Sequence, residues 1–209
     1  MIITNQNKIE VTLAELYNDA KFDMLKAMKG AAKSVFRPLQ PSDFEDVYLS
    51  ISKEQGEDLY RLIKEKNLKN IVEFGTSFGI STLFLAQGAV ETGGRIITTE
   101  LIESKAKKAV ENFKDAGVND LIEVRVGDAM ETLKNHQEPI DLLLLDGWKD
   151  LYLPLFQMLE PNFHPNTIVY VDNADMSDSR AFLKTVSQNS RYQLQSIFGG
   201  KAVLITVNK

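Results

Sequence analysis

The sequence contains no cysteine and only two histidines, His136 and His164, among its 209 residues. Without thiols it can form no disulfide, thiolate zinc site, iron–sulfur cluster or cysteine nucleophile. Two imidazoles cannot build a three-histidine metal site, and a serine–histidine–aspartate triad would have to use one of them. Acids are plentiful instead, with 29 Asp and Glu against 24 Lys and Arg and a net charge of −5. We therefore expect any metal to be held by oxygen, and proton transfer to run through Asp, Glu, Lys or Tyr.

Long apolar runs and a basic stripe are also missing. The run from Ile140 to Leu145 is interrupted by Asp141 and falls far below the ~20 residues that a membrane span needs. Residues 1–8 do not show a charged start followed by an apolar core, so we expect no signal peptide. The negative net charge argues against nucleic-acid binding. These absences predict a cytoplasmic protein that binds neither membranes nor nucleic acids.

The length predicts one main domain, here residues 48–209, preceded by a helical extension over residues 1–47. Apolar residues from Leu13 to Val35 recur every three or four positions, which is typical of one face of a long helix. Pro38 and Pro41 would end that helix. Two interpretations remain open: the helix packs on the main domain, or it forms a lid or the contact of a homodimer beside the active site.

The main domain begins with a helix and continues as alternating strands and helices. Ser52 and Gln55 fit a capping box, which would start a helix that runs to about Lys66. From residue 70 onward, apolar and β-branched runs alternate with helical patterns, which predicts right-handed crossovers and a parallel sheet covered on both faces. The predicted strands are 70–74, 95–100, 121–126, 140–146 and 167–172, and the predicted helices are 79–91, 102–116, 128–136, 151–160 and 177–189. Residues 192–198 and 202–207 flank Gly199-Gly200-Lys201, which indicates a final antiparallel hairpin.

Two glycines follow the first predicted strand. Gly75 and Gly79 lie in an E-x-G-x-x-x-G pattern that opens a helix, where a glycine permits a sharp turn and close approach of a ligand. The dinucleotide fingerprint would require glycine at the position of Ser77, which disfavours a pyrophosphate cradle. The glycines alone are compatible with either a cofactor site or a plain tight turn.

Two further acids favour the cofactor site. Glu100 ends the second predicted strand, where a carboxylate can accept both hydroxyls of a ribose. Asp128 follows the third predicted strand, where an acid or its neighbouring amide can meet an adenine edge. Ligands of open α/β sheets bind beyond the carboxyl ends of the strands. Polar groups at three such ends therefore predict a nucleoside with a charged tail.

Another pair of acids ends the fourth and fifth predicted strands. Asp146 and Asp172 each follow an apolar run, and the ends of neighbouring strands lie ~5 Å apart. Carboxylates that close repel each other unless a cation lies between them. With Asn173 they would supply the oxygen ligands that Mg²⁺ prefers, and Lys149 would be within reach. The alternative is that one acid caps a helix while the other is solvated.

The assembled motifs resemble a known family. Residues 145–154, which read LDGWKDLYLP, followed by Asp172-Asn173, are similar to class I S-adenosylmethionine-dependent O-methyltransferases of the catechol O-methyltransferase-like group. The resemblance covers roughly residues 48–175. It implies a Rossmann-like α/β fold: a mostly parallel seven-stranded sheet, a C-terminal antiparallel hairpin and, in this chain, the N-terminal helical extension.

The resemblance also implies roles for individual residues. Asp146, Asp172 and Asn173 would bind Mg²⁺ or another divalent cation, and Lys149 would be the general base. Asp146 would also act in catalysis and lie at the cofactor. The residues expected to bind S-adenosylmethionine are Ile51, Glu73, Gly75, Ser77, Ser81, Glu100, Leu101, Asp128, Ala129, Asp146 and Trp148.

The implied function is transfer of a methyl group from S-adenosylmethionine to a hydroxyl of a small, aromatic, catechol-like acceptor. Two departures from the family's pattern stand out: Gly147 replaces a histidine after the metal-binding acid, and residues 199–202 lack the acid expected at the second catechol hydroxyl. The second departure counts against catechol itself. The alternatives are a metal-independent methyltransferase on another nucleophile, a nonenzymatic cofactor-binding protein, and an NAD-linked oxidoreductase.

Overall fold

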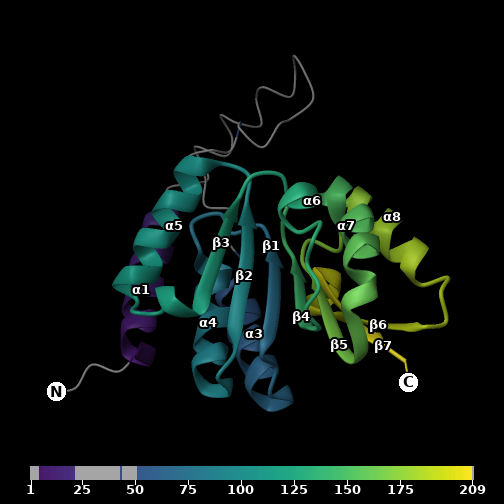
Figure 1. The fold of residues 1–209 in the computed structure, drawn as a ribbon, viewed down its shortest axis with the longest axis horizontal. Helices are drawn as coiled ribbons and strands as arrows, with labels where there is room; N and C mark the ends of the chain where they lie inside the picture. Colours follow the sequence, from purple (N-terminus) through teal and green to yellow (C-terminus); the bar gives the residue numbers. More distant parts are fainter. Residues whose placement is uncertain (1–4, 22–42, 44–50, 209) are drawn as a thin grey trace.

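The computed structural model describes residues 5–21, 43 and 51–208. Its centre is a seven-stranded sheet with the strand order β3-β2-β1-β4-β5-β7-β6 (Figure 1). The strands are β1 Asn70–Phe74, β2 Arg95–Glu100, β3 Ile122–Val126, β4 Ile140–Leu145, β5 Phe163–Val171, β6 Tyr192–Ile197 and β7 Ala202–Val207. Strands β1 to β5 are parallel, and β7 lies antiparallel between β5 and β6. The predicted fold class and its C-terminal hairpin are therefore confirmed.

Helices cover both faces of the sheet (Figure 1). One layer contains α1 (Asn5–Ala20), α3 (Lys53–Lys66), α4 (Ile80–Thr92) and α5 (Glu103–Asp115), and the other contains α6 (Ala129–Thr132), α7 (Tyr152–Leu159) and α8 (Ser177–Val186). In β4, Leu142 and Leu144 face the first layer, whereas Leu143 and Leu145 face the second. Successive side chains of a strand point to opposite faces. A strand buried on both sides therefore reads as a continuous apolar run.

The N-terminal helix packs on the main domain where the structure describes it. Ile9, Leu13 and Leu16 of α1 are buried in the core beside α4 and α5. The Gln6 side chain also donates to the carbonyl of Gln87 in α4 at 3.1 Å. The rest of the predicted helix, up to Val35 with the stop at residues 38 and 41, lies outside the described residues. The boundary between residues 47 and 48 also lies outside and stays a prediction.

Two elements differ most from their predicted extents. Helix α6 covers only Ala129–Thr132 and not residues 128–136, because Asp128 is its N-cap and the residues that follow include the weak helix formers Asn135 and His136. Strand β5 begins at Phe163 and not at residue 167. Its early part contains Pro165, which cannot donate a ladder hydrogen bond, and its register with β4 shifts there.

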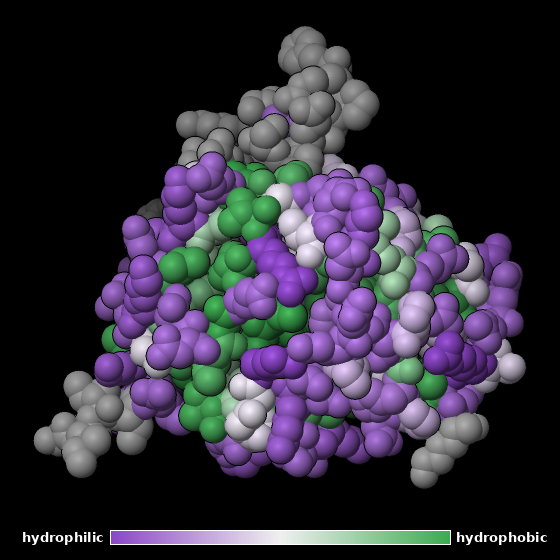
Figure 2. Space-filling view, viewed as in Figure 1, coloured by the Kyte–Doolittle hydropathy of each residue, from purple (hydrophilic) through white to green (hydrophobic). Residues whose placement is uncertain are grey.

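Apolar side chains show on the surface over β2 and β3, next to the short α6 (Figure 2).

None of the helices in the described ranges has the length and apolar character needed to cross a membrane.

The start of α3 follows its prediction closely. The Ser52 hydroxyl accepts from the Gln55 amide and the Gln55 side chain accepts from the Ser52 amide, both at 3.2 Å, so the capping box is confirmed.

Candidate active site

The predicted site residues follow the carboxyl ends of parallel strands and meet at one edge of the sheet. Leu145 of β4 pairs with Phe74 of β1 on one side and with Val171 of β5 on the other. The ladder continues one residue further, since the amide of Asp146 donates to Phe74 and that of Asp172 donates to Leu145. The sheet therefore brings the glycine turn and the two acids together, as the strand pattern predicts.

The glycine turn, which contains Gly75 and Gly79, follows β1 and lies close to the end of β4. Gly75 has φ 106°, and a Cβ there would lie 2.7 Å from the carbonyl oxygen of Asp146, so no larger residue fits. Ser77 also has a positive φ of 49°, and its amide donates to Glu100 Oε2 at 2.7 Å. The Ser77 hydroxyl is buried without a hydrogen-bond partner. Such an orphaned polar group is rare and fits a site that a polar ligand completes.

Glu100 joins the turn to the next strand. Its Oε2 accepts from Ser77 and its Oε1 accepts from the amide of Ile102 at 2.9 Å. A carboxylate has about four acceptor positions, so both oxygens retain capacity for the two hydroxyls of a ribose. The neighbouring Leu101 is 55% exposed, an unusual position for a leucine that fits an apolar contact with a bound base.

Glu73 lies in β1, two residues before Gly75. It is fully buried, and its two oxygens accept hydrogen bonds from the hydroxyls of Ser81, Thr82 and Thr98 at 2.5–2.6 Å. Burial raises the pKa of this carboxyl, although the three hydroxyl donors oppose that shift. Glu73 ties β1, β2 and α4 together beneath the turn, and its place in the cofactor site stays a prediction. The Ser81 hydroxyl donates its proton to Glu73 in one of these hydrogen bonds.

The expected adenine side is more open. Asp128 is exposed, and its carboxylate caps α6 by accepting from the amide of Met130 at 2.8 Å. Ala129 is buried beside it, and Trp148 is half-buried against the core under α7. Ile51 is buried before α3, and its carbonyl accepts from the Tyr17 hydroxyl at 3.0 Å. Asp128 and Ala129 follow β3, and Trp148 follows β4, at the carboxyl edge of the sheet.

The two acids form a pair with little exposure: Asp172 is 4% exposed and the Asp146 side chain is 9% exposed. Burial and the charge of Asp172 raise the pKa of Asp146 well above its usual value, and Lys149 opposes that shift. The Lys149 ammonium lies 3.9 Å from Asp146 Oδ1 and donates to the carbonyl of Gly147 at 2.8 Å. It also lies 5.8 Å from the ring centre of Tyr152, a buried phenol. One lysine at that distance leaves the pair with excess negative charge.

This donor set fits a hard divalent cation. No group of three His, Cys, Asp or Glu side chains suited to a metal occurs within residues 5–21, 43 and 51–208. A site here would therefore combine the two carboxylates with a neutral oxygen. Asn173 follows Asp172 directly, with φ 51°, and supplies such an amide. Mg²⁺ commonly takes one or two carboxylates and keeps several waters, so the pair and one amide suffice.

Sequence reasoning missed one polar contact of the acid pair. Gln55 Nε2 donates to Asp172 Oδ1 at 2.6 Å, although the two residues are 117 positions apart. The sequence marks Gln55 as part of a capping box, and no local pattern predicts a second partner so far along the chain.

The departure at Gly147 has a steric cause in this chain. A Cβ at Gly147 would lie 2.5 Å from the ring of Phe74, which is 7% exposed and packs edge-on against Tyr152. The space that a side chain at position 147 would need is filled by the Phe74 ring. A histidine there would require the Phe74 ring to move.

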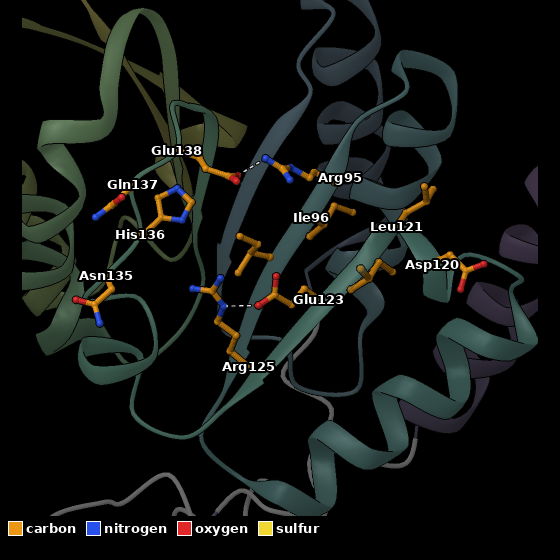
Figure 3. Close-up of a pocket in the computed structure, with 12 residues that line it drawn as sticks. Arg95, Ile96, Asp120, Leu121, Glu123, Arg125, Asn135, His136, Gln137 and Glu138 are labelled. Atoms are coloured by element: carbon orange, nitrogen blue, oxygen red, sulfur yellow. Dashed lines mark hydrogen bonds and ion pairs between the residues drawn. The ribbon is translucent and has the colours of Figure 1, made fainter.

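A cavity of about 480 Å³ lies at the opposite edge of the sheet, where β2, β3 and β4 begin (Figure 3). It lies between two ion pairs, Arg95 with Glu138 and Arg125 with Glu123, and beside His136. Burial and the two arginines lower the pKa of His136. None of the predicted site residues lines this cavity.

Comparison with known proteins agrees with the fold and the site edge. A family model described as "Methyltransferase domain" matches residues 72–174. The chain is 33% identical over 129 residues to the catechol O-methyltransferase of Niastella koreensis, covering 60% of this chain and 58% of that protein. It is also 33% identical over 126 residues to the catechol O-methyltransferase of Mycobacterium tuberculosis, covering 60% and 57%. The matches thus span less than two thirds of either relative.

Solved structures match over more of the chain. An O-methyltransferase from Bacillus cereus in complex with SAH has a TM-score of 0.68 at 26% identity, covering 88% of this chain and 97% of that one. A SAH-bound methyltransferase from Podospora anserina has a TM-score of 0.72 at 19% identity, which supports the fold alone.

The fold and these matches point to one class: residues 72–174 are similar to methyltransferase domains, and the chain is similar in fold to a solved O-methyltransferase. Within that class, the resemblance to O-methyltransferases of the catechol O-methyltransferase-like group is confirmed.

Proposed function

We propose that this protein is an S-adenosylmethionine-dependent O-methyltransferase that uses Mg²⁺ or another divalent cation and methylates a hydroxyl of a small aromatic acceptor. The observation that carries the proposal is the buried pair of Asp146 and Asp172, with Lys149 3.9 Å from Asp146. A pair of acids without enough positive charge is costly to bury. Its position at the carboxyl edge, next to the glycine turn, favours a functional reason for that cost.

The bound groups supply chemistry that the side chains cannot. When bound, S-adenosylmethionine supplies a methyl group already activated for transfer, and Mg²⁺ supplies positive charge that favours the ionised form of an acceptor hydroxyl. Asp146, Asp172 and Asn173 would hold the cation. The side chains that surround it then need to orient the acceptor and accept one proton.

As a neutral amine, Lys149 is placed to take that proton. Its Nζ is anchored by the carbonyl of Gly147 at 2.8 Å, on the same side as Asp146. A general base must lie within hydrogen-bond reach of the hydroxyl it serves. The hydroxyl oxygen of an acceptor bound beside Asp146 would lie within hydrogen-bond reach of the Lys149 amine.

The glycine turn and Glu100 orient the cofactor. Gly75 allows the backbone to approach it, the Ser77 hydroxyl offers an unpaired polar group, and Glu100 offers acceptor positions to a ribose. Leu101, Asp128, Ala129 and Trp148 would border the base, and Ile51 and Ser81 the methionine end. Fixing the methyl donor relative to the acceptor oxygen contributes a large share of the rate enhancement of such transfers.

The turn between β6 and β7 bears on the acceptor. The Ala174 amide donates to the carbonyl of Lys201 at 2.8 Å, so this turn lies beside the segment that follows Asp172. The turn offers Phe198, which is 37% exposed, and no acid. It therefore favours an aromatic acceptor that does not depend on a carboxylate at this turn.

The test is methyl transfer from labelled S-adenosylmethionine to a panel of catechols, flavonoids and hydroxycinnamates, with Mg²⁺ and with EDTA. We expect transfer to at least one hydroxyl with Mg²⁺ and its loss in EDTA. Full activity in EDTA would contradict the metal requirement and favour the metal-independent alternative. Calorimetric titrations of the protein with S-adenosylmethionine and, separately, with NAD test the identity of the cofactor. Preferential binding of NAD would contradict the proposal that S-adenosylmethionine is the cofactor. The cytoplasmic location and the homodimer stay predictions; light scattering of the purified protein tests the latter.

A further inference from the structure

Gln55, in the first turn of α3, reaches the pair formed by Asp146 and Asp172 at the carboxyl edge of the sheet. Gln55 is 7% exposed, and its Nε2 donates to Asp172 Oδ1 at 2.6 Å. Asp172 itself is 4% exposed. A buried hydrogen bond to a carboxylate is stronger than one between neutral groups and leaves a large penalty when its donor is removed.

The capping box fixes the orientation of this donor. Gln55 Oε1 accepts from the Ser52 amide at 3.2 Å, and an N–H can bond only to the oxygen of the carboxamide. The NH₂ end must therefore face Asp172. Both ends of the carboxamide are held, one by the backbone of the α3 N-terminus and the other by the acid pair.

The turn that presents Gln55 is itself anchored. Ile51, which precedes the capping box, accepts from the Tyr17 hydroxyl of α1 at 3.0 Å. Gly56, the next residue after Gln55, faces the ring of Phe84 so closely that a Cβ would lie 2.3 Å from it. The start of α3 is therefore held against both α1 and α4.

We propose that Gln55 is a positioning residue, which fixes the Asp172 carboxylate so that its second oxygen is available to share a cation with Asp146. This inference rests on the proposed function. A carboxylate free to rotate would lose part of its interaction with the cation, because ligand groups act best when other contacts orient them. Gln55 holds Asp172 without adding charge to a pair that already has too much.

Three variants separate this role from helix capping. Gln55→Glu keeps an acceptor for the Ser52 amide, since glutamate also completes a capping box, but removes the donor to Asp172. Gln55→Met removes both contacts at similar size. Ser52→Ala removes the hydroxyl cap and leaves the Gln55 side chain intact. The readouts are kcat and KM for S-adenosylmethionine, Tm without metal, and the rise in Tm on adding Mg²⁺.

We expect Gln55→Glu and Gln55→Met to lower kcat by about tenfold or more, while KM for S-adenosylmethionine changes by less than about twofold. The Mg²⁺-induced rise in Tm, which reports binding to the folded state, should change in both variants. Ser52→Ala should lower Tm and leave kcat and the Mg²⁺ response as in the unmodified protein.

Unchanged kcat and Mg²⁺ response in Gln55→Glu and Gln55→Met would overturn the inference. Equal losses in Ser52→Ala would also overturn it, because they would assign the effect to the cap. The Mg²⁺ response is measured without any acceptor. A protein that transfers no methyl group but shows a Gln55-dependent Mg²⁺ response would contradict the proposed function and leave the positioning role supported.

Discussion

Two buried acids of this protein, Glu73 at the end of β1 and Asp146 just beyond β4, lie near the same sheet edge but have opposite surroundings. Glu73 accepts from three hydroxyls. Asp146 faces a second carboxylate, and its nearest cation is a lysine at 3.9 Å. Burial raises the pKa of both acids. The difference lies in the compensation: three hydroxyl donors oppose the effect of burial at Glu73, whereas a second carboxylate adds to it at Asp146.

The largest expected effect is on activity at Asp146. Asp146→Asn should lower methyl transfer by about a hundredfold or more, because it removes one carboxylate from the cation site. It should not lower stability, since it relieves the repulsion with Asp172. The measurements are turnover with Mg²⁺ and the free energy of unfolding. Asp178→Asn, an exposed acid at the start of α8, is the matched control. Retained turnover would show that the cation site is assigned wrongly.

The same acid predicts a pH dependence. A carboxyl whose pKa is raised on folding stabilises the fold fully below the unfolded pKa, and this contribution is lost as pH rises toward the folded pKa. In EDTA, the unfolding free energy of the unmodified protein should therefore fall, relative to that of Asp146→Asn, as pH rises above about 4. Denaturant titrations across pH measure this. Asp146→Asn should show a smaller fall, and an identical pH dependence in the two proteins would contradict the raised pKa of Asp146.

The next largest effect concerns the base. Lys149→Met should lower kcat by about a hundredfold or more, because a positioned base contributes that much to proton transfer. The affinity for S-adenosylmethionine should stay within about twofold, since no cofactor contact is assigned to this amine. Single-turnover kinetics and calorimetry measure the two quantities, with the exposed Lys184→Met as control. Loss of affinity without loss of kcat would give Lys149 a binding role.

Glu73 should show the opposite pattern to Asp146. Glu73→Ala should lower the free energy of unfolding by about 2–4 kcal/mol, because three buried hydroxyls lose their acceptor. Glu138→Ala, which removes an exposed partner of Arg95, should cost less than about 1 kcal/mol. Denaturant unfolding tests both. A Glu73→Ala protein that is as stable as its parent but binds S-adenosylmethionine poorly would assign Glu73 to cofactor binding and not to the stability of the fold.

The smallest expected effect tests the contact between Phe74 and Gly147. Gly147→Ala should cost about 1–3 kcal/mol, because its Cβ overlaps the Phe74 ring. Phe74→Leu should reduce that cost when the two changes are combined. A double-mutant cycle of unfolding free energies measures the coupling. Additive costs would mean that the two positions do not compete for space.

The sequence predicts much of the fold because the apolar runs that make parallel strands are recognisable one at a time. The runs at 70–74, 95–100 and 140–145 gave β1, β2 and β4, and Ser52 with Gln55 gave the start of α3. The short α6 and the early start of β5 were missed, since neither shows a strong local signal. Strand alternation also predicted that Asp146 and Asp172 would meet, because the carboxyl ends of parallel strands share one edge.

The sequence by itself determined the alternation of strands and helices, the residue types at each strand end, and the absence of thiol chemistry. Only the tertiary structure decided that Glu73 is enclosed by Ser81, Thr82 and Thr98, that Gln55 reaches Asp172, and that Phe74 excludes a side chain at Gly147. The physical reason is the distance along the chain over which each kind of interaction acts. Periodicity and caps act between near neighbours, whereas the environment of a buried polar group depends on which distant segments the sheet and its layers bring against it.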